Sequence, residues 1–74
     1  MRLLEYIYSY DHLTEGAFSE STINKHIKKG YIKFNHLNSK NLKVYWLTKK
    51  GLIELKYKDK PIPKWLQDYK EGTV

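Results

Sequence analysis

The spacing of apolar residues predicts two helical segments at the start of the chain. In residues 1–10 the apolar positions fall on one face of a helix. Residues 13–18 repeat this arrangement over one to two turns and predict a short second helix. Gly16 weakens that helix, because glycine in a helix interior costs roughly 1 kcal/mol relative to alanine. The apolar positions of the two segments are Leu3, Leu4, Ile7 and Tyr8, and then Leu13, Ala17 and Phe18.

A third helix is predicted to end at residue 29. The hydroxyl of Ser19 or Ser21 can cap its first turn by accepting a hydrogen bond from an unpaired backbone amide. Ile23 and Ile27 are its inward positions, and Gly30 suits a helix C-terminus. At about 100° per residue, the face opposite Ile23 is short, polar and basic. Its members are Ser21, Lys25 and Lys28, with Thr22, Asn24 and Lys29 on the flanks.

Two strands follow the third helix. Residues 31–37 begin with strict alternation, which puts Ile32 and Phe34 on the same side, and residues 42–47 alternate again. Between them, residues 38–41 read Asn-Ser-Lys-Asn, four residue types that form turns. The sequence therefore predicts a two-stranded hairpin with a lysine at its tip.

The last third of the chain predicts a short helix, a loop and a short amphipathic piece. Thr48 can cap a helix over residues 49–56. Residues 58–63 contain two prolines, which disfavour helix, and therefore form a loop. The final piece, residues 64–70, carries Trp65, Leu66 and Tyr69.

These elements divide the chain into a domain over residues 1–57 and a C-terminal loop and amphipathic segment over residues 58–74. Trp46 and Trp65 are the aromatic residues that a core of three helices explains least. We therefore expect the C-terminal segment to dock on the hairpin or on a second copy of the chain, with Trp65 as a possible contact to a protein partner.

Positive charge is concentrated in the middle of the chain. The 74 residues carry 14 Lys and Arg and 8 Asp and Glu, for a formal net charge of +6. Residues 1–20 hold one cation and four anions, residues 21–58 hold ten lysines and one glutamate, and residues 59–74 balance. A basic segment of this kind attracts polyanions, chiefly nucleic acid. A solvated surface in a lysine-rich protein is the alternative explanation.

The sequence lacks the signatures of several other classes of protein. There is no cysteine, which excludes disulfide scaffolds, thiolate zinc sites and thiol catalysis and favours a cytoplasmic location. No apolar run is long enough for a membrane-spanning helix, so we expect no membrane association. No phosphate-binding glycine loop, nucleophile elbow or carboxylate pair is recognisable, and we expect no enzyme activity. Neither a metal nor another cofactor is expected, since the histidines lack ligand spacing: His12, His26 and His36.

Two stretches resemble winged helix-turn-helix DNA-binding proteins. Residues 18–27, Phe-Ser-Glu-Ser-Thr-Ile-Asn-Lys-His-Ile, resemble the turn and recognition helix of helix-turn-helix proteins, including Cro-type phage repressors. Ala17 and Ile23 keep the spacing between the small turn residue and the helix anchor in that motif. Residues 45–52, Tyr-Trp-Leu-Thr-Lys-Lys-Gly-Leu, are similar to the strand-to-helix junction of the MarR and PadR repressor groups.

The resemblance implies a small α+β fold: three helices and a two-stranded hairpin wing, then a short helix and a tail. It implies a sequence-specific regulator of transcription, such as a repressor, that binds double-stranded DNA as a homodimer. The lysine-rich, arginine-poor composition favours an origin in a phage or mobile element. The third helix would read the major groove, and the wing at residues 38–41 would contact the backbone or minor groove. The implied base contacts are Ser21, Thr22, Asn24 and Lys25, and the implied backbone contacts are Lys28, Lys29, Lys33, Lys40 and Lys43.

Two alternatives remain open at this point. A MerR or excisionase-type winged helix has a similar order of elements, and excisionase-type proteins shape DNA for recombination instead of repressing transcription. A winged helix can also serve as a protein-interaction module, acting as a small inhibitor or assembly factor, because fold alone does not settle function.

Overall fold

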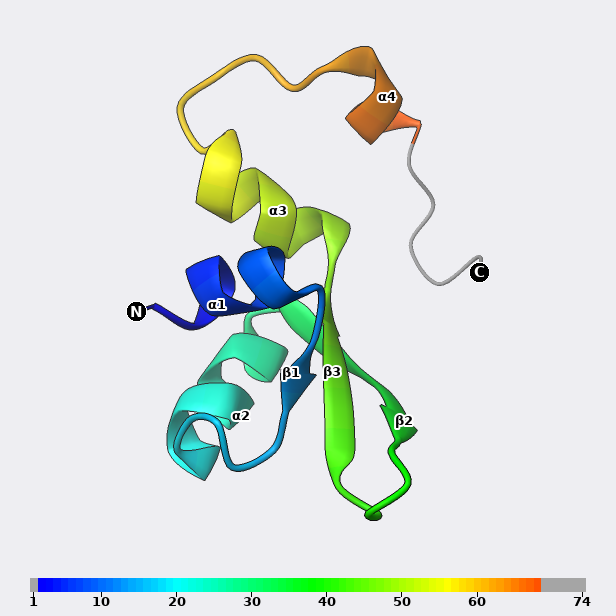
Figure 1. The fold of residues 1–74 in the computed structure, drawn as a ribbon. Coiled ribbons are helices and arrows are strands. Elements are labelled where there is room, and N and C mark those ends of the chain that lie inside the picture. Colours follow the sequence, from blue (N-terminus) through cyan, green and yellow to red (C-terminus); the bar gives the residue numbers. More distant parts are fainter. Residues whose placement is uncertain (1, 69–74) are drawn as a thin grey trace.

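Four helices and a three-stranded antiparallel sheet make up the part of the chain that the computed structural model describes, residues 2–68 (Figure 1). The chain is therefore of the α+β class, as the sequence predicts. No helix in residues 2–68 is both long enough and apolar enough to cross a membrane. In chain order the elements are α1 (Leu3–Tyr10), β1 (Leu13–Thr14), α2 (Glu20–Lys28), β2 (Ile32–Leu37), β3 (Lys43–Leu47), α3 (Lys49–Lys56) and α4 (Lys64–Gln67).

The predicted second helix over residues 13–18 does not form, and this prediction was wrong. Leu13 and Thr14 instead form β1, which pairs antiparallel with β3. Gly16 has a φ of +99°, a left-handed conformation that an α-helix cannot contain. The predicted two-stranded hairpin is thus part of a three-stranded sheet in the order β1-β3-β2.

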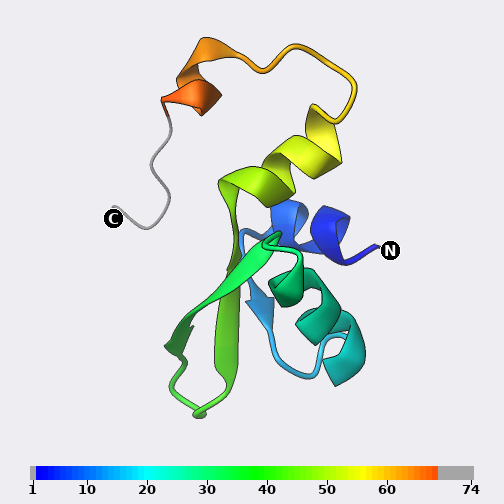
Figure 2. The same cartoon turned by 180° about the vertical axis from the view of Figure 1, so that it is seen from behind.

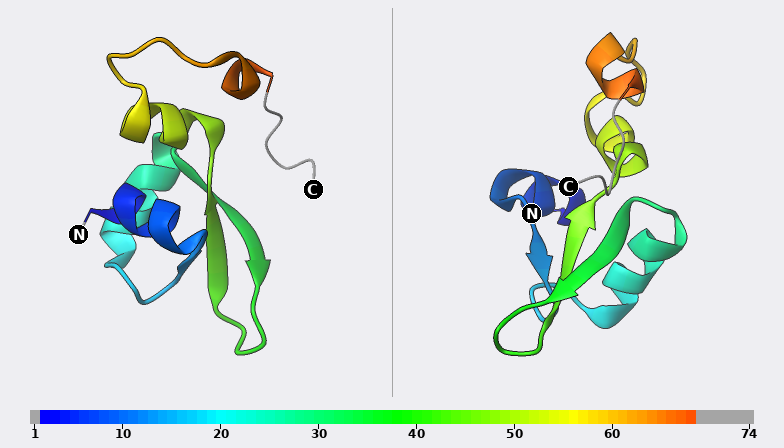
Figure 3. Two further views of the ribbon diagram at one scale, coloured as in Figure 1. Left: turned by 45° about the horizontal axis from the view of Figure 1, so that its top comes forward. Right: turned by 90° about the vertical axis from the view of Figure 1, so that its right-hand side faces the viewer.

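Helices α1 and α2 cover one face of the sheet, and the core lies between them and the strands (Figure 3). Residues paired across strands share a face, so Phe34 and Tyr45 lie on the covered face. Lys33 and Trp46 lie on the opposite face. Each core side chain contributes roughly 1.5–3 kcal/mol by its burial. The core residues are Leu3, Ile7, Leu13, Ile23, Ile32 and Tyr45.

The start of α3 is tied to the turn between α2 and β2. The backbone amide of Thr48 donates to the Tyr31 carbonyl at 3.0 Å, and its hydroxyl donates to the Gly30 carbonyl at 2.5 Å. The same hydroxyl accepts a hydrogen bond from the Gly51 amide at 3.0 Å and so caps α3, as predicted. We call these contacts the Thr48 junction.

Two glycines make the Thr48 junction possible. The backbone of Gly51 packs against the Tyr31 carbonyl, and an added Cβ would overlap that oxygen and the Leu47 side chain. Gly30 turns the chain out of α2 with a φ of +79°, which L residues rarely adopt. Residues 47–51, Leu-Thr-Lys-Lys-Gly, therefore specify both the start of α3 and its contact with the turn between α2 and β2.

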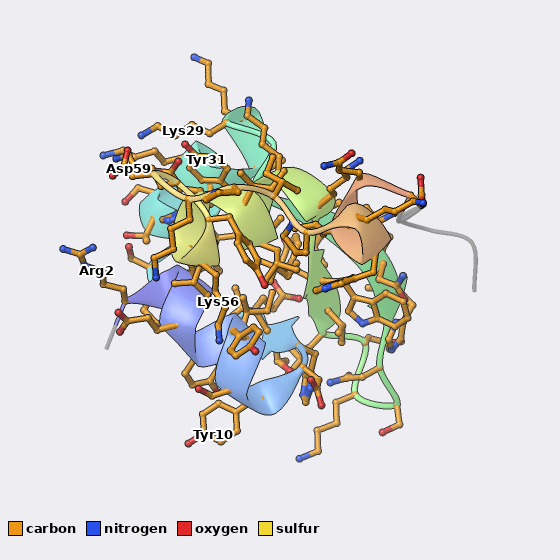
Figure 4. All side chains as sticks on the ribbon, turned by 90° about the horizontal axis from the view of Figure 1, so that it is seen from above. Arg2, Tyr10, Lys29, Tyr31, Lys56 and Asp59 are labelled. Carbon is orange, nitrogen blue, oxygen red and sulfur yellow. The ribbon has the colours of Figure 1, made fainter. Side chains whose placement is uncertain are left out.

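Helices α3 and α4 extend the molecule away from the hairpin (Figures 1 and 2). Lys56 reaches from α3 toward α1, where its Nζ lies 4.3 Å from the centroid of the Tyr8 ring (Figure 4). At the other end of α3, the Lys49 Nζ donates to the Gln67 carbonyl at 2.9 Å. Leu66 of α4 is fully buried, whereas Trp65 is 58% exposed.

The predicted C-terminal piece is only partly described. It runs from residue 64 to residue 70, and Tyr69 and Lys70 lie outside the described residues. Its described part is the four-residue helix α4. Docking of this piece on the hairpin or on a second copy stays a prediction.

We expect Thr48→Val to lower the free energy of unfolding by about 2–3 kcal/mol. Valine keeps the side-chain shape but leaves the Gly30 carbonyl and the Gly51 amide without their hydroxyl partner, and buried unsatisfied groups cost about 1–3 kcal/mol each. Urea denaturation followed by tryptophan fluorescence measures the change. Thr48→Ser retains the hydroxyl and is the matched control, with an expected loss of about 1 kcal/mol or less. Equal losses for the two variants would contradict this role of the hydroxyl.

Candidate nucleic-acid interface

Ser19 caps α2, the helix that carries the predicted base-contact residues. The Ser19 Oγ accepts a hydrogen bond from the Thr22 amide at 3.3 Å and lies 2.7 Å from the Thr22 hydroxyl. The Ile23 side chain is 3% exposed and packs in the core, which holds α2 against the sheet. The cap and the buried isoleucine together fix which side of α2 faces solvent.

Three of the four predicted base-contact residues lie on the solvent side of α2. Ser21, Asn24 and Lys25 are exposed, at positions that a helix brings together. Thr22 is half-buried and its hydroxyl is engaged with the Ser19 cap. With His26, it lines a cleft of about 530 Å³ between α1, α2 and α3. Thr22 is therefore separated from the other three.

The hairpin turn is held in one conformation by Asn38. Its Oδ1 accepts hydrogen bonds from the Lys40 amide at 2.8 Å and the Leu42 amide at 3.1 Å. The backbone closes the turn, since the Asn41 amide donates to the Asn38 carbonyl at 2.9 Å and Asn41 has a φ of +63°. Lys40 is thereby presented at the tip of a hairpin that projects beyond α1 and α2 (Figures 1 and 2).

The predicted backbone-contact lysines of the sheet lie on opposite faces. Lys43 pairs with Leu37 and so lies on the face that α2 covers, whereas Lys33 pairs with Trp46 on the other face. Lys43 can therefore contact the same ligand as the exposed residues of α2. Lys33 lies on the far side of the sheet from α2.

The remaining predicted backbone contacts are on α2 itself. Lys28 is exposed in the last turn. Lys29 follows as the C-cap, at the end of α2 farther from the hairpin turn (Figures 1 and 4). Lysines in the last turn of a helix also interact favourably with the helix dipole.

Negative charge flanks this surface near the start of α2. Glu15 and Glu20 line the same hollow of about 290 Å³ as Asn24 and Lys43. The Glu15 carboxylate accepts a hydrogen bond from the Lys43 amide at 2.6 Å, and the Glu15 amide donates to the Lys43 carbonyl at 2.9 Å. Glu15 thus clamps the base of the hairpin. No signal in the sequence indicates this role, because it depends on the strand that replaces the predicted helix.

The lysines of the surface carry unneutralised charge. Residues 21–53 contain eight lysines and no acidic residue. Within residues 2–68, neither Lys25, Lys28 nor Lys40 forms an ion pair with an acidic side chain. The positive field of α2 and the hairpin is therefore available to an external anion.

The prediction that Ile27 is an inward position of α2 was wrong, because Ile27 is 37% exposed. Two further apolar residues, both on β2, were not predicted to be exposed. The alternation in β2 places Phe34 on the inward side, yet Phe34 is 51% exposed and Leu37 is 52% exposed. Phe34 does lie on the covered face, with its ring 6.3 Å from that of Tyr45. Its neighbour Tyr45 on the central strand β3 is 6% exposed, whereas Phe34 lies on β2, the edge strand of the sheet.

Within residues 2–68, no group of three or more His, Cys, Asp or Glu side chains is arranged to hold a metal ion. The chain matches no protein-family model, no curated protein and no solved structure. The case for a function therefore depends on the residues of this chain.

We expect Asn38→Ala to free the hairpin turn without unfolding the protein. The substitution removes the acceptor of the Lys40 and Leu42 amides, and a hydrogen bond of this kind is worth about 1 kcal/mol. Amide hydrogen exchange measured by NMR should accelerate by about fivefold or more at both residues. Ser39→Ala, one position along the same turn, is the control and should leave both rates unchanged. Unchanged exchange in Asn38→Ala would show that the backbone alone holds the turn.

Proposed function

We propose that the chain is a winged-helix-type protein that binds double-stranded DNA sequence-specifically and regulates transcription. One observation carries this proposal: residues 21–53 contain eight lysines and no acidic residue. Some of these lysines are exposed on α2 and others on the hairpin. DNA is the polyanion that such a surface matches best, because its phosphates are regularly spaced along a rigid duplex.

The order of elements supports a winged-helix-type arrangement. Helix α2 is followed directly by the β2–β3 hairpin, and the two lie side by side, since Asn24 of α2 and Lys43 of β3 line the same hollow. A turn over residues 15–18 replaces the helix that the resemblance implies before α2. This departure leaves the exposed side of α2 and the hairpin intact.

Sequence readout is assigned to the exposed side of α2. Asn24 can pair bidentately with adenine and Lys25 can donate to guanine, and each good bidentate contact contributes roughly 1–3 kcal/mol of discrimination. Ser21 adds a short donor and acceptor beside them, since it is exposed and its hydroxyl makes only a longer contact, 3.4 Å, with the Ser19 hydroxyl. Thr22 is left out of this set, because its hydroxyl contacts the Ser19 cap.

Glu20 restricts how α2 can approach a duplex. It lies in the first turn of α2, where its carboxylate repels phosphates. Contact with phosphates is therefore assigned to Lys25 and Lys28, which lie beyond this first turn, and to Lys40 at the hairpin tip. These lysines are assigned to the phosphate backbone on either side of the groove, except that Lys25 also reaches a base.

A homodimer on two half-sites about 34 Å apart stays a prediction of the resemblance. Sedimentation of the complex with a selected duplex measures the number of chains bound.

Binding to a labelled duplex of about 25 base pairs, followed by anisotropy between roughly 50 and 200 mM salt, tests the proposal. We expect affinity to fall steeply with salt and to exceed that for single strands or an anionic polymer. Lys28→Ala with Lys40→Ala should reduce the slope of log affinity against log salt by about 1.8, because each phosphate contact contributes about 0.9. At about 0.1 M salt this corresponds to a roughly 10- to 100-fold loss of affinity.

Lys60→Ala with Lys64→Ala is the matched control, since it removes the same charge from exposed positions near α4. A long-range effect of net charge would weaken both double variants equally and would contradict the assigned surface. No preference of the wild-type protein for duplex over the polymer would overturn the proposal.

One observation favours a second candidate, binding of a protein partner through α4. Trp65 is 58% exposed there, on the part of the molecule opposite the hairpin turn (Figure 1). Exposed tryptophan is enriched at protein interfaces. A pull-down from nuclease-treated lysate that recovers one stoichiometric partner, and loses it with Trp65→Ala, would favour this function.

A further inference from the structure

The β2–β3 hairpin carries an apolar edge on the side that faces the proposed DNA. Phe34 and Leu37 are 51% and 52% exposed on β2. Both lie on the face of the sheet that α2 covers, because Phe34 pairs with Tyr45 and Leu37 pairs with Lys43. Two large apolar side chains therefore project from a hairpin whose charged residues are all lysines.

A β-bulge puts Leu37 on this face. The register of β2 against β3 shifts between Phe34 and His36. In a regular strand, residues 34 and 37 point to opposite faces, because side chains alternate. The extra residue, Asn35, restores Leu37 to the face of Phe34, and bulges commonly re-aim side chains at functional sites. The exposure of Leu37 on this face thus has a specific structural cause.

The charge around this apolar edge determines what can cover it. Lys43 is directly opposite Leu37, and Lys40 lies in the turn beside it. A second copy docking the same face would bring like charges together, which is unfavourable. An anionic partner is complementary, and proteins that insert an apolar side chain between the bases of DNA do so from the minor groove.

We propose that Leu37, supported by Phe34, is an apolar wedge that enters a base step from the minor groove and kinks the duplex. Lys40 and Lys43 hold the flanking phosphates while the leucine side chain partly unstacks the bases. Pyrimidine–purine steps, which unstack most easily, are the preferred points of entry. This inference depends on the proposed DNA-binding function and adds deformation of the DNA to it.

The test compares two duplexes of one sequence, fully paired or with two adjacent central mismatches. A mismatch lowers the cost of unstacking, so a wedge binds the mismatched duplex more tightly. We expect the wild-type protein to prefer it by about tenfold. A donor and acceptor dye at the two ends should also report a shorter distance when the protein binds the paired duplex. The single strand of the same sequence must bind more weakly than either duplex.

Variants isolate the leucine. Leu37→Ala should reduce the preference to less than about twofold and abolish the change in dye distance, while the salt slope stays unchanged because the lysines remain. Leu37→Ile should retain both effects, since the apolar volume is kept. Trp65→Ala removes an equally exposed apolar side chain on α4 and should also retain them. Leu37 is half exposed, so its truncation leaves the core unchanged, and thermal unfolding verifies this.

The outcomes separate the wedge from the proposed function. If the wild-type protein binds both duplexes with equal affinity and the distance between the dyes is unchanged, the wedge proposal is wrong, but the proposed DNA binding is still supported. Loss of the preference in Trp65→Ala as well as Leu37→Ala also overturns it. Absence of duplex binding above the anionic polymer overturns both. A preference for the mismatched duplex that depends on Leu37 supports the wedge.

Discussion

The Thr48 junction is the contact on which the arrangement of the other elements depends. A single buried hydroxyl donates to the turn that ends α2 and accepts from the first turn of α3, while the backbone of the same residue closes the end of the sheet. The exit of α2, the start of β2 and the end of β3 are therefore fixed at one point. The position of the exposed side of α2 relative to the hairpin follows from this, because both leave the junction in defined directions.

Much of the fold could be predicted from local chemistry. The helix over residues 3–10, the capped helix α2 and the hairpin each follow from spacing, capping residues and turn residues within about ten positions. The segment at residues 13–18 could not, because its apolar residues fit a helix and a strand equally well. Pairing with β3, more than 25 residues away in sequence, decides in favour of a strand, and the left-handed Gly16 then ends it. Local propensity carries no information about such a pairing.

The candidate site could be predicted only in part, for the same reason. Helical projection from Ile23 correctly separates the exposed Ser21 and Lys25 from the core side of α2. It cannot indicate that the Thr22 hydroxyl is taken up by the cap, nor that the bulge at Asn35 changes the face of every later residue of β2. The alternation of side chains along a strand assigns a face only up to an irregularity, because one extra residue moves every later side chain to the other face. The lysines were therefore identified by composition, whereas the apolar edge of the hairpin became visible only in three dimensions.

The bulge in β2 also bears on solubility. In the sheet order β1-β3-β2, strand β2 is an edge strand, whose outer row of amide and carbonyl groups has no partner within the sheet. An edge that also carries exposed Phe34 and Leu37 is a template for pairing with another chain. The bulge interrupts the regular spacing of those groups, and the half-exposed Lys33 brings charge to the same strand. Both features are known to oppose edge-to-edge aggregation. The irregularity that puts Leu37 on the same face as Phe34 therefore also hinders another chain from pairing with the strand that carries them.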